Sequence, residues 1–280
     1  MIIEINHETR YNYETEVLLN PHILYLTIQN RNYYKITHHS IIVDPEPTGL
    51  NALIDLENSS YYQAWFGRYT NHLNIKVQFI VEAAEFNPLH FIYDSRFTKL
   101  STGFDYGGYK NNLIEVYLHQ LFLPELKSFA LEFFHATSDI VTFLHSINAY
   151  IHQHWQHEIR IEPGFQHPLI TFSDKRGSCR DLAYMMMEML KSVGLASRFV
   201  SGYAYNPSLS EEHNLHAWID IYMPGAGWIG IDPSLGLFCD HHYFPLAASY
   251  EPSNTLPVIG TFGGTSGSEL YTFVDIQEKN

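Results

Sequence analysis

The chain has 280 residues, 45% of them hydrophobic, which is enough to bury the core of one large domain or two smaller ones. Its 16 basic and 30 acidic residues give a net charge of −14, which argues against nucleic acid as a partner because phosphate binding needs a positive surface. Two cysteines make no disulfide framework, no apolar run approaches the ~18 residues of a membrane span, and the N-terminus does not resemble a signal peptide. We therefore expect a soluble, cytoplasmic protein with reduced thiols and no membrane contact.

Residues 1–95 have the pattern of β-strands. Residues 3–13 alternate with period two, and residues 36–43 and 73–81 are two further β-rich runs. Polar turns and prolines separate these runs, which is typical of an antiparallel sandwich. Glycines punctuate residues 96–112, which we interpret as a linker.

From residue 113 onward, helical and strand-like periods follow one another. This order predicts an α+β chain in which a β-rich domain at residues 1–95 precedes a helix-and-sheet core at residues 113–280. The expected helices cover residues 124–135, 140–159 and 179–193, and the expected strands cover residues 198–205, 213–222 and 228–232.

Cys179 stands at the start of the third expected helix. Ser178 is a good N-cap, Asp181 has the spacing of a capping box, and Gly194 offers a C-terminal stop. Free N–H groups and the dipole of a first helical turn favour an anion, so a thiolate forms there more easily than in free cysteine, whose pKa is about 8.5. An inert buried thiol is the alternative interpretation of this stretch, and it is the one we adopt for Cys239.

The hairpin that follows predicts a histidine–aspartate pair. If residues 222–226 form its loop, the register places His216 directly opposite Asp232 on the same face. A loop one residue longer or shorter would move Asp232 to the other face. The same register sets Gly230 opposite Trp218, which leaves room for the indole ring.

These residues would form a Cys–His–Asp set if the helix packs against the hairpin. Cys179 would attack as the thiolate, and His216 would hold the thiol's proton and then deliver it to the leaving group. Asp232 would fix the tautomer of His216 and stabilise its cation. Backbone N–H groups at the helix start would hold the oxyanion.

Three further residues are candidates for substrate binding. Gln166, in the loop before the helix, is a candidate second donor to the oxyanion. Tyr203 and Trp218 are candidates to line the cleft, and core packing accounts for both rings equally well.

A metal site is the rival chemistry. His213 with His216, or His216, His241 and His242 with Asp232, could supply zinc ligands. Residues three apart in a strand point to opposite faces, however, which separates His213 from His216. The sequence also contains neither Cys-x-x-Cys nor His-Glu-x-x-His, so we expect no metal and no cofactor.

Four blocks together resemble the bacterial transglutaminase-like superfamily, which comprises papain-like Cys–His–Asp proteins often described as cysteine proteases. The blocks are GSCRDLA at 177–183, VSGY at 200–203, HAW at 216–218 and GWIGIDPS at 227–234. The resemblance extends to HETRYNY at 7–13, which is similar to the opening strand of the family's β-rich N-terminal domain. It also includes residues 257–264, which are similar to the closing loop before a last strand, here residues 269–276.

The resemblance implies the same roles for Cys179, His216 and Asp232 as nucleophile, base and orienting acid. The chain departs from the family by placing Ser178 before the cysteine, and by RDLA after it where QDFA is usual. An arginine-containing segment expected near residues 18–19 is also replaced. These departures bear on substrate preference and leave the three site residues intact.

The sequence thus favours a thiol-dependent hydrolase that cleaves peptide or amide bonds of a peptide or protein substrate through an acyl-thioester on Cys179. Transfer of the acyl group to an amine would use the same residues and stays open. A peptide-binding protein of this fold without turnover is the third alternative.

Overall fold

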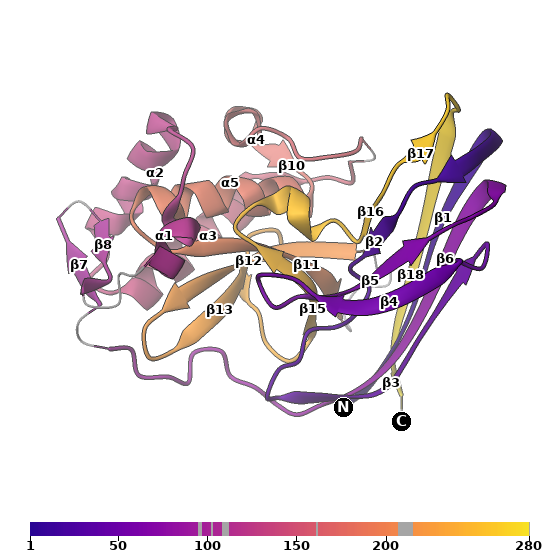
Figure 1. Cartoon of the computed structure of the whole chain (residues 1–280). Coiled ribbons are helices and arrows are strands. Elements are labelled where there is room, and N and C mark those ends of the chain that lie inside the picture. Colours follow the sequence, from indigo (N-terminus) through magenta and orange to yellow (C-terminus); the bar gives the residue numbers. More distant parts are fainter. Residues whose placement is uncertain (95–96, 102, 108–111, 161, 207–214, 280) are drawn as a thin grey trace.

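A computed structural model describes residues 1–94, 97–101, 103–107, 112–160, 162–206 and 215–279. The fold is α+β, as the sequence predicts, with the helices gathered at one end of the molecule and the longest strands at the other (Figure 1). Within the described residues, no helix is long and apolar enough to cross a membrane.

The N-terminal region is built from two antiparallel sheets. Alternation along the first strand buries Ile3, Ile5 and His7, each at most 3% exposed, while the residues between them face outward or sideways. Side chains from both sheets, such as Phe79 and Leu24, share one apolar core. The first sheet consists of β1 (Ile2–Leu19), β3 (Tyr34–Asp44), β6 (Tyr69–Ala83), β17 (Phe262–Gly263) and β18 (Ser268–Lys279), and the second of β2 (His22–Leu24), β4 (Gly49–Ile54), β5 (Ser60–Trp65) and β16 (Val258–Ile259).

The end of the chain returns to these sheets. β18 pairs antiparallel with β1 from Ile2↔Lys279 to Tyr13↔Ser268, and β16 pairs with β2. The assignment of residues 113–280 to one core therefore does not match the strand pairing, because β16, β17 and β18 complete the N-terminal sheets. Periodicity identifies a strand but does not identify its partner, which is why this return could not be predicted from the sequence.

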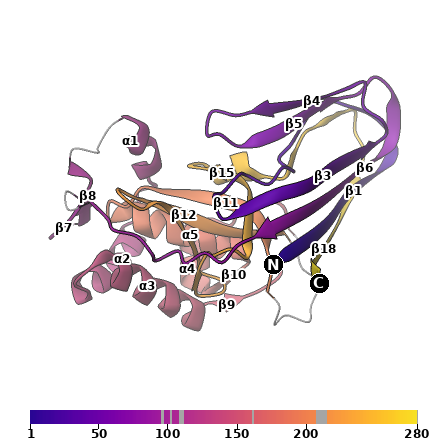
Figure 2. The same ribbon diagram turned by 90° about the horizontal axis from the view of Figure 1, so that it is seen from below.

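A further antiparallel sheet, the central sheet, has the order β14-β13-β12-β11-β15 and forms the centre of the remaining chain. Residues 84–94 cross beneath this sheet on the way from β6, as Figure 2 shows from below, and Asp94 donates its backbone N–H to Pro224 O at 2.8 Å. The strands are β11 (Ser197–Ala204), β12 (Leu215–Met223), β13 (Gly227–Asp232), β14 (Leu237–Phe238) and β15 (Tyr243–Ser249).

Helix α5 (Cys179–Ser192) is the buried axis of the helical end. Its predicted apolar face, including Leu182, Met186 and Met189, is at most 1% exposed and packs with β11 and β12. Gly194 ends the helix with φ +83°, a left-handed conformation that favours glycine. Around α5 lie α1 (Asn112–Leu118), α2 (Pro124–Ala136), α3 (Ile140–His154) and α4 (Pro168–Asp174), with a short 3-10 helix, Pro252–Thr255, after β15.

Helix α3 ends five residues before the sequence predicts. Trp155 is already extended, with φ −106° and ψ 130°, and the next two residues form β9 (Gln156–His157). β9 pairs parallel with β10 (Arg176–Gly177), which immediately precedes α5. The chain leaves the helix because this pairing provides hydrogen-bond partners for its backbone in place of those inside the helix.

The expected linker at residues 96–112 lies partly outside the described residues. Its described part contains a small hairpin of β7 (Thr98–Leu100) and β8 (Gly103–Asp105) in place of an open loop. Tyr106 anchors it, since its hydroxyl donates to Tyr222 O at 2.7 Å and accepts from the backbone N–H of Ala196 at 2.9 Å.

Candidate active site

Cys179 is the first residue of α5, as the sequence predicts. Asp181 accepts the backbone N–H of Ser178 at 3.1 Å, which is the carboxylate half of a capping box. The same carboxylate accepts the Ser178 hydroxyl at 2.6 Å. The first-turn N–H of Cys179 has no partner inside the helix, so it is free to bind an oxygen of a substrate.

Asp181 also ties the helix start to the preceding loop. It is fully buried, forms a two-point ion pair with Arg160 at 2.8 and 3.0 Å, and accepts the backbone N–H of Gln166 at 2.9 Å. Burial alone would raise the pKa of Asp181, but these hydrogen bonds hold it below its usual range. The nucleophile candidate is therefore fixed on a rigid, fully bonded helix start.

His216 and Asp232 form a hydrogen-bonded pair across β12 and β13, with His216 Nε2 and Asp232 Oδ2 2.6 Å apart. The predicted register is wrong by two residues, because Met223 pairs with Gly227 and Asp220 lies opposite Gly230. His216 is thus diagonal to Asp232 instead of directly opposite. A shift of two residues preserves the face, which is why the pair still forms.

Asp232 is fully buried and accepts five hydrogen bonds. Oδ2 binds His216 and the Tyr243 hydroxyl at 2.9 Å, while Oδ1 binds the Ser234 N–H and hydroxyl and the Leu235 N–H at 2.6 to 3.2 Å. Burial would raise the pKa of Asp232, but the His216 charge and these donors hold it below the usual range. The carboxylate is therefore a fixed anion beside the imidazole.

Two imidazoles, those of His157 and His216, act on the Cys179 thiol. Burial opposes its ionisation, but the interactions with these two rings lower the pKa of Cys179 to about 6. For His216, burial opposes the charged form, but Asp232 and the thiolate raise its pKa well above the usual value. Since Asp232 occupies Nε2, Nδ1 is the nitrogen that faces the sulfur. A thiolate–imidazolium pair is the expected resting form at neutral pH.

This geometry agrees with the comparison to known sequence families. Residues 127–233 match the transglutaminase-like superfamily, and residues 3–82 match the bacterial transglutaminase-like N-terminal region. The chain belongs to the transglutaminase-like superfamily.

Its relatives within this superfamily are distant. The chain is 27% identical over 106 residues to protein ML0607 of Mycobacterium leprae, covering 36% of this chain and 37% of that one. It is 22% identical over 292 residues to Rv2569c of Mycobacterium tuberculosis, covering 97% and 91%. A 70-residue stretch is 31% identical to the protein-glutamine gamma-glutamyltransferase of Pseudomonas aeruginosa. This chain spans 37% of the length of ML0607 and 10% of the Pseudomonas enzyme, so it covers only a part of either protein.

A candidate cysteine protease from Cytophaga hutchinsonii has a similar structure. The two share a TM-score of 0.74 at 15% identity, over 100% of this chain and 92% of the other. At this identity the likeness shows the fold, which extends over the whole of this chain and most of the other.

Two of the three predicted substrate-binding residues lie in the core of this transglutaminase-like protein. Tyr203 is fully buried on the face of β11 opposite to His216, and its hydroxyl is 2.8 Å from His7 Nδ1. Trp218 is 2% exposed and lies next to His216, with ring centroids 6.3 Å apart. Both predictions are wrong for a cleft-lining role, because neither ring reaches the surface. Gln166 is half-buried, and its role as a donor stays a prediction.

Glycines make the space that Trp218 needs. A Cβ on Gly202 would lie 2.7 Å from the Trp218 ring and 2.4 Å from Phe244 O. Gly230, which the sequence sets against Trp218, instead admits Cys239, whose Cβ would be 2.6 Å from an added carbon. Cys239 is buried, and burial raises its pKa well above the usual value, in keeping with a structural thiol.

His157 is the residue that the sequence analysis missed. It lies in β9, inside the stretch where helical spacing of apolar side chains predicted a continuing helix. The pairing of Gly177 with His157 brings it beside the start of α5. A signal was present in the sequence, since Pro163-Gly164 ends the helix region a few residues later, but nothing local indicates the parallel pairing.

Within the part of the chain that the structure describes, His216, His241, His242 and Asp232 do not come together as a zinc set. Among the described residues, the group that brings three donor atoms within 4.8 Å is Asp240, His241 and His242, without Asp232 or His216. His213 lies outside the described residues. The predicted histidine sets are therefore not assembled around Asp232, and the absence of a metal stays a prediction.

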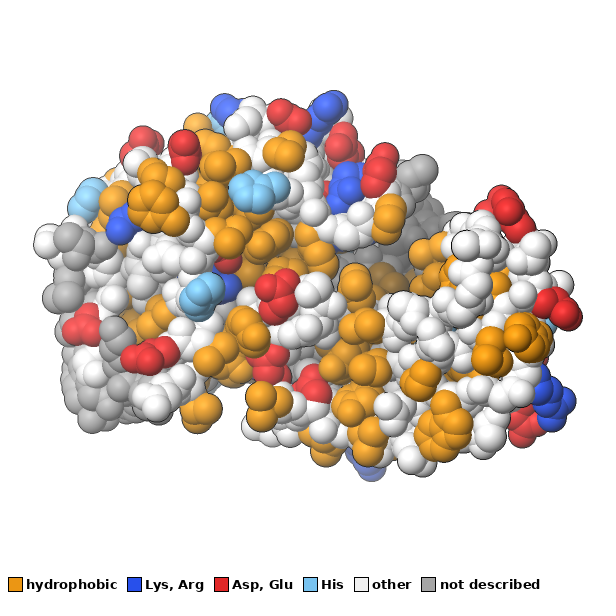
Figure 3. All heavy atoms as spheres, turned by 45° about the horizontal axis from the view of Figure 1, so that its top comes forward, with side chains coloured by type: hydrophobic (Ala, Val, Ile, Leu, Met, Phe, Trp, Pro, Cys, Tyr) orange, Lys and Arg blue, Asp and Glu red, His pale blue; other side chains and the backbone are white. Residues whose placement is uncertain are grey.

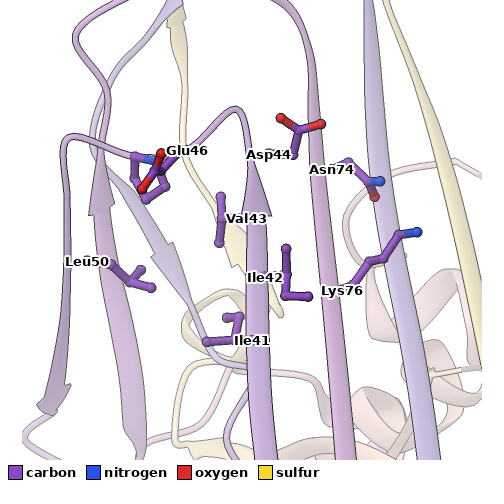
Figure 4. A pocket seen from close by; sticks show the side chains of 9 residues that line it. Ile41, Ile42, Val43, Asp44, Glu46, Leu50, Asn74 and Lys76 are labelled. Atoms are coloured by element: carbon purple, nitrogen blue, oxygen red, sulfur yellow. The ribbon is translucent and has the colours of Figure 1, made fainter.

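Other surface features lie away from these residues. A hollow between β3, β4 and β6 is lined by residues including Ile42, Asp44, Leu50 and Lys76 (Figure 4). Its lining contains none of the three candidate catalytic residues and no histidine or cysteine. On the face drawn in Figure 3, acidic and basic side chains are interspersed. The exclusion of nucleic-acid partners and the cytoplasmic location both stay predictions from the sequence.

Proposed function

We propose that this chain is a thiol-dependent hydrolase that cleaves peptide or amide bonds through an acyl-thioester on Cys179. One observation carries the proposal, namely that the buried Asp232 carboxylate is hydrogen-bonded to His216, which acts on the Cys179 thiol and helps to lower its pKa to about 6. Family membership and the shared fold agree with this chemistry.

The reaction follows from the protonation states. The Cys179 thiolate attacks the carbonyl carbon, a C–S bond forms, and the carbonyl π electrons move to oxygen. The tetrahedral intermediate collapses, and His216 Nδ1–H gives its proton to the departing amine. His216 then takes a proton from water as that water attacks the thioester, and collapse of the second tetrahedral intermediate breaks the C–S bond, releases the acid and restores the thiolate–imidazolium pair. Asp232 holds the ring in one orientation throughout.

Replacing Cys179 tests the proposal. Cys179→Ala should abolish turnover of a panel of fluorogenic peptide substrates, because it removes the sulfur on which the acyl-thioester forms. Cys239→Ala is the matched control, since it removes the buried thiol and leaves the site in place. Equal turnover by wild type and Cys179→Ala would eliminate the hydrolase.

Acyl transfer is the second candidate, because the Pseudomonas relative is a protein-glutamine gamma-glutamyltransferase. The thioester would then pass its acyl group to an amine instead of water. Product analysis with and without an added primary amine separates the two reactions. Binding of peptides without any Cys179-dependent product would instead indicate a non-catalytic binding protein.

A further inference from the structure

The Cys179 thiol has two imidazole partners, and the reaction described above uses only one of them. His216 is oriented by a carboxylate and serves as the base. His157 pairs with Gly177, two residues before Cys179, and its ring also acts on the thiol, but it is not part of that chain of bonds. The question is what a second ring does at this position.

The backbone of His157 is fixed relative to the sulfur. Gln156 donates its N–H to Lys175 O at 2.8 Å, and Glu158 donates to Gly177 O at 3.0 Å. These bonds flank His157 on both sides and join it to the strand that leads directly into Cys179. The His157 backbone is therefore held in place by paired strands and does not belong to a loop.

The segment after His157 is clamped as well. Arg160 forms the ion pair with Asp181 and donates to Gly164 O at 2.8 Å. Arg180, the residue that follows the nucleophile, donates to Arg160 O at 3.2 Å. Both ends of the His157 segment are therefore held to the first turn of α5.

The surroundings of His157 favour a donor and not a second base. Within the described part of the chain, His216 has a carboxylate partner, while no carboxylate is recorded beside the His157 ring, which acts on the thiol. The ring is exposed, so a substrate carbonyl can reach it from solvent. The thiol has one proton to lose and His216 accepts it, which leaves His157 with an N–H to offer.

We propose that His157 is the second donor of the oxyanion hole, together with the backbone N–H of Cys179. The inference rests on the proposed function and names a further catalytic residue for it. As the C–S bond forms and the carbonyl π electrons move to oxygen, the His157 N–H donates a hydrogen bond to the new oxyanion. No proton is transferred to or from His157, and the hydrogen bond is lost when the intermediate collapses.

This assignment replaces the prediction that Gln166 is the second donor. The Gln166 backbone N–H is used by Asp181, which places the residue beside the carboxylate that caps the helix. His157, in contrast, is held beside the start of α5 by its pairing with Gly177, and its ring acts on the reacting thiol. A donor must lie about 3 Å from the developing oxyanion, which forms two bonds away from that sulfur.

Two probes of the same thiol isolate the oxyanion contact. p-Nitrophenyl acetate acylates Cys179 through a tetrahedral oxyanion, whereas iodoacetamide alkylates it by direct displacement at carbon without one. Both rates are measured at pH 9, where even a thiol with an ordinary pKa of about 8.5 is mostly ionised. The ratio of acylation to alkylation therefore reports the oxyanion donor and not the thiolate fraction.

His157→Ala should lower this ratio by about 10²- to 10³-fold, the effect of removing one such donor. His157→Gln, which keeps an N–H, should recover part of the loss. His145→Gln on the exposed side of α3 is the matched control and should leave the ratio unchanged. Thermal unfolding of each variant shows that the fold is retained.

A parallel fall in both rates would overturn the inference, because it would mean that His157 acts only on the thiol. An unchanged ratio would overturn it as well. The activated ester requires no natural substrate, so a chain that acylates normally but cleaves no peptide would refute the proposed function and leave the role of His157 standing.

Discussion

The N-terminal sheets and the central sheet each bury a histidine with a tyrosine hydroxyl close by, yet the two rings have opposite properties. His7 lies between the Tyr203 hydroxyl and Thr9 Oγ1, both at 2.8 Å. Burial lowers the pKa of His7 to about 4, because neither partner is charged. His216 is bonded to the Asp232 carboxylate, which raises its pKa. The same side chain is thus a neutral structural bridge in one sheet and a charged group in the other.

The two cysteines repeat this contrast. Burial acts on both thiols in the same direction, but the pKa of Cys179 falls to about 6 while the pKa of Cys239 rises. Cys179 faces two imidazoles, whereas Cys239 faces the carboxylates of Asp220 and Asp232. Of the two histidines and of the two cysteines, the one that can act in a reaction is therefore distinguished by the charge of its neighbours and not by burial.

Removing the carboxylate from the central sheet should have the largest effect. Asp232→Asn keeps the shape but removes the charge that holds His216 as a cation, so acylation of Cys179 should fall about 10³- to 10⁴-fold. The pH at which iodoacetamide labelling is half-maximal should also rise from about 6 toward about 8.5. Without a charged imidazolium beside it, the Cys179 thiolate is less stable, so the thiol ionises only at higher pH.

Asp240→Asn is the control for this prediction, since Asp240 is a partly exposed acid in the segment after β14. Its labelling midpoint should stay near pH 6. Mass spectrometry after labelling at pH 7 should find Cys179 modified and Cys239 unmodified. A midpoint near pH 6 in Asp232→Asn would contradict the electrostatic account of the site.

Replacing His7, the neutral histidine of the N-terminal sheet, should have the next largest effect. It should change how the stability of the fold depends on pH. The folded pKa of His7 is about 4, below the usual 6.5, so the unfolded chain binds the extra proton as pH falls through that window. Stability from this residue is present above pH 6.5 and is lost toward pH 4. Its size is about 2–3 kcal/mol between pH 7 and pH 4.5.

Urea unfolding of His7→Gln at both pH values measures this term. The variant should lose less stability on acidification than wild type by that amount, whereas His38→Gln, on the exposed side of β3, should behave as wild type. His216 has the opposite sign, because its raised pKa stabilises the fold at low pH and the contribution fades as pH rises. Identical acid sensitivity in His7→Gln and wild type would refute the neutral bridge.

The smallest effect is expected from packing behind the pair. Gly202→Ala would place a carbon 2.4 Å from Phe244 O and 2.7 Å from the Trp218 ring. The backbone oxygen cannot move freely, so the variant should lose about 1–3 kcal/mol of stability. Gly263→Ala, whose added carbon meets Leu18 O at 3.8 Å, is the control. Equal melting temperatures for the two variants would show that Trp218 is not held as described.

The sequence predicted those features of the site that depend on local periodicity. Ser178 and Asp181 predicted the helix start correctly, because capping is decided within one turn. His216 and Asp232 came together despite a register error of two residues, since an even shift keeps the face. The three roles at Cys179, His216 and Asp232 stay proposals until activity is measured.

The features it missed depend on which segments meet. His157 reaches the sulfur through a two-residue parallel pairing with Gly177, a contact that no sequence period encodes. Tyr203 was predicted to line the cleft because the sequence does not show that the N-terminal sheet packs against β11. In the structure, the Tyr203 hydroxyl is hydrogen-bonded to His7 of that sheet. The same pairing explains why helix α3 ends before the predicted residue, since the chain enters β9 instead of continuing the helix.

The ladder between β1 and β18 has a consequence for how the chain folds. It joins Ile2 to Lys279, so the first strand leaves the ribosome long before its neighbour is synthesised. Until then one edge of β1 has unpaired backbone groups that can pair with any other extended chain. The residues that this ladder joins are also very far apart in the sequence, which makes the pairing slow to form. Co-translational folding of the helical end is therefore expected to precede closure of the N-terminal sheet, and misassembly in the interval would begin at that edge.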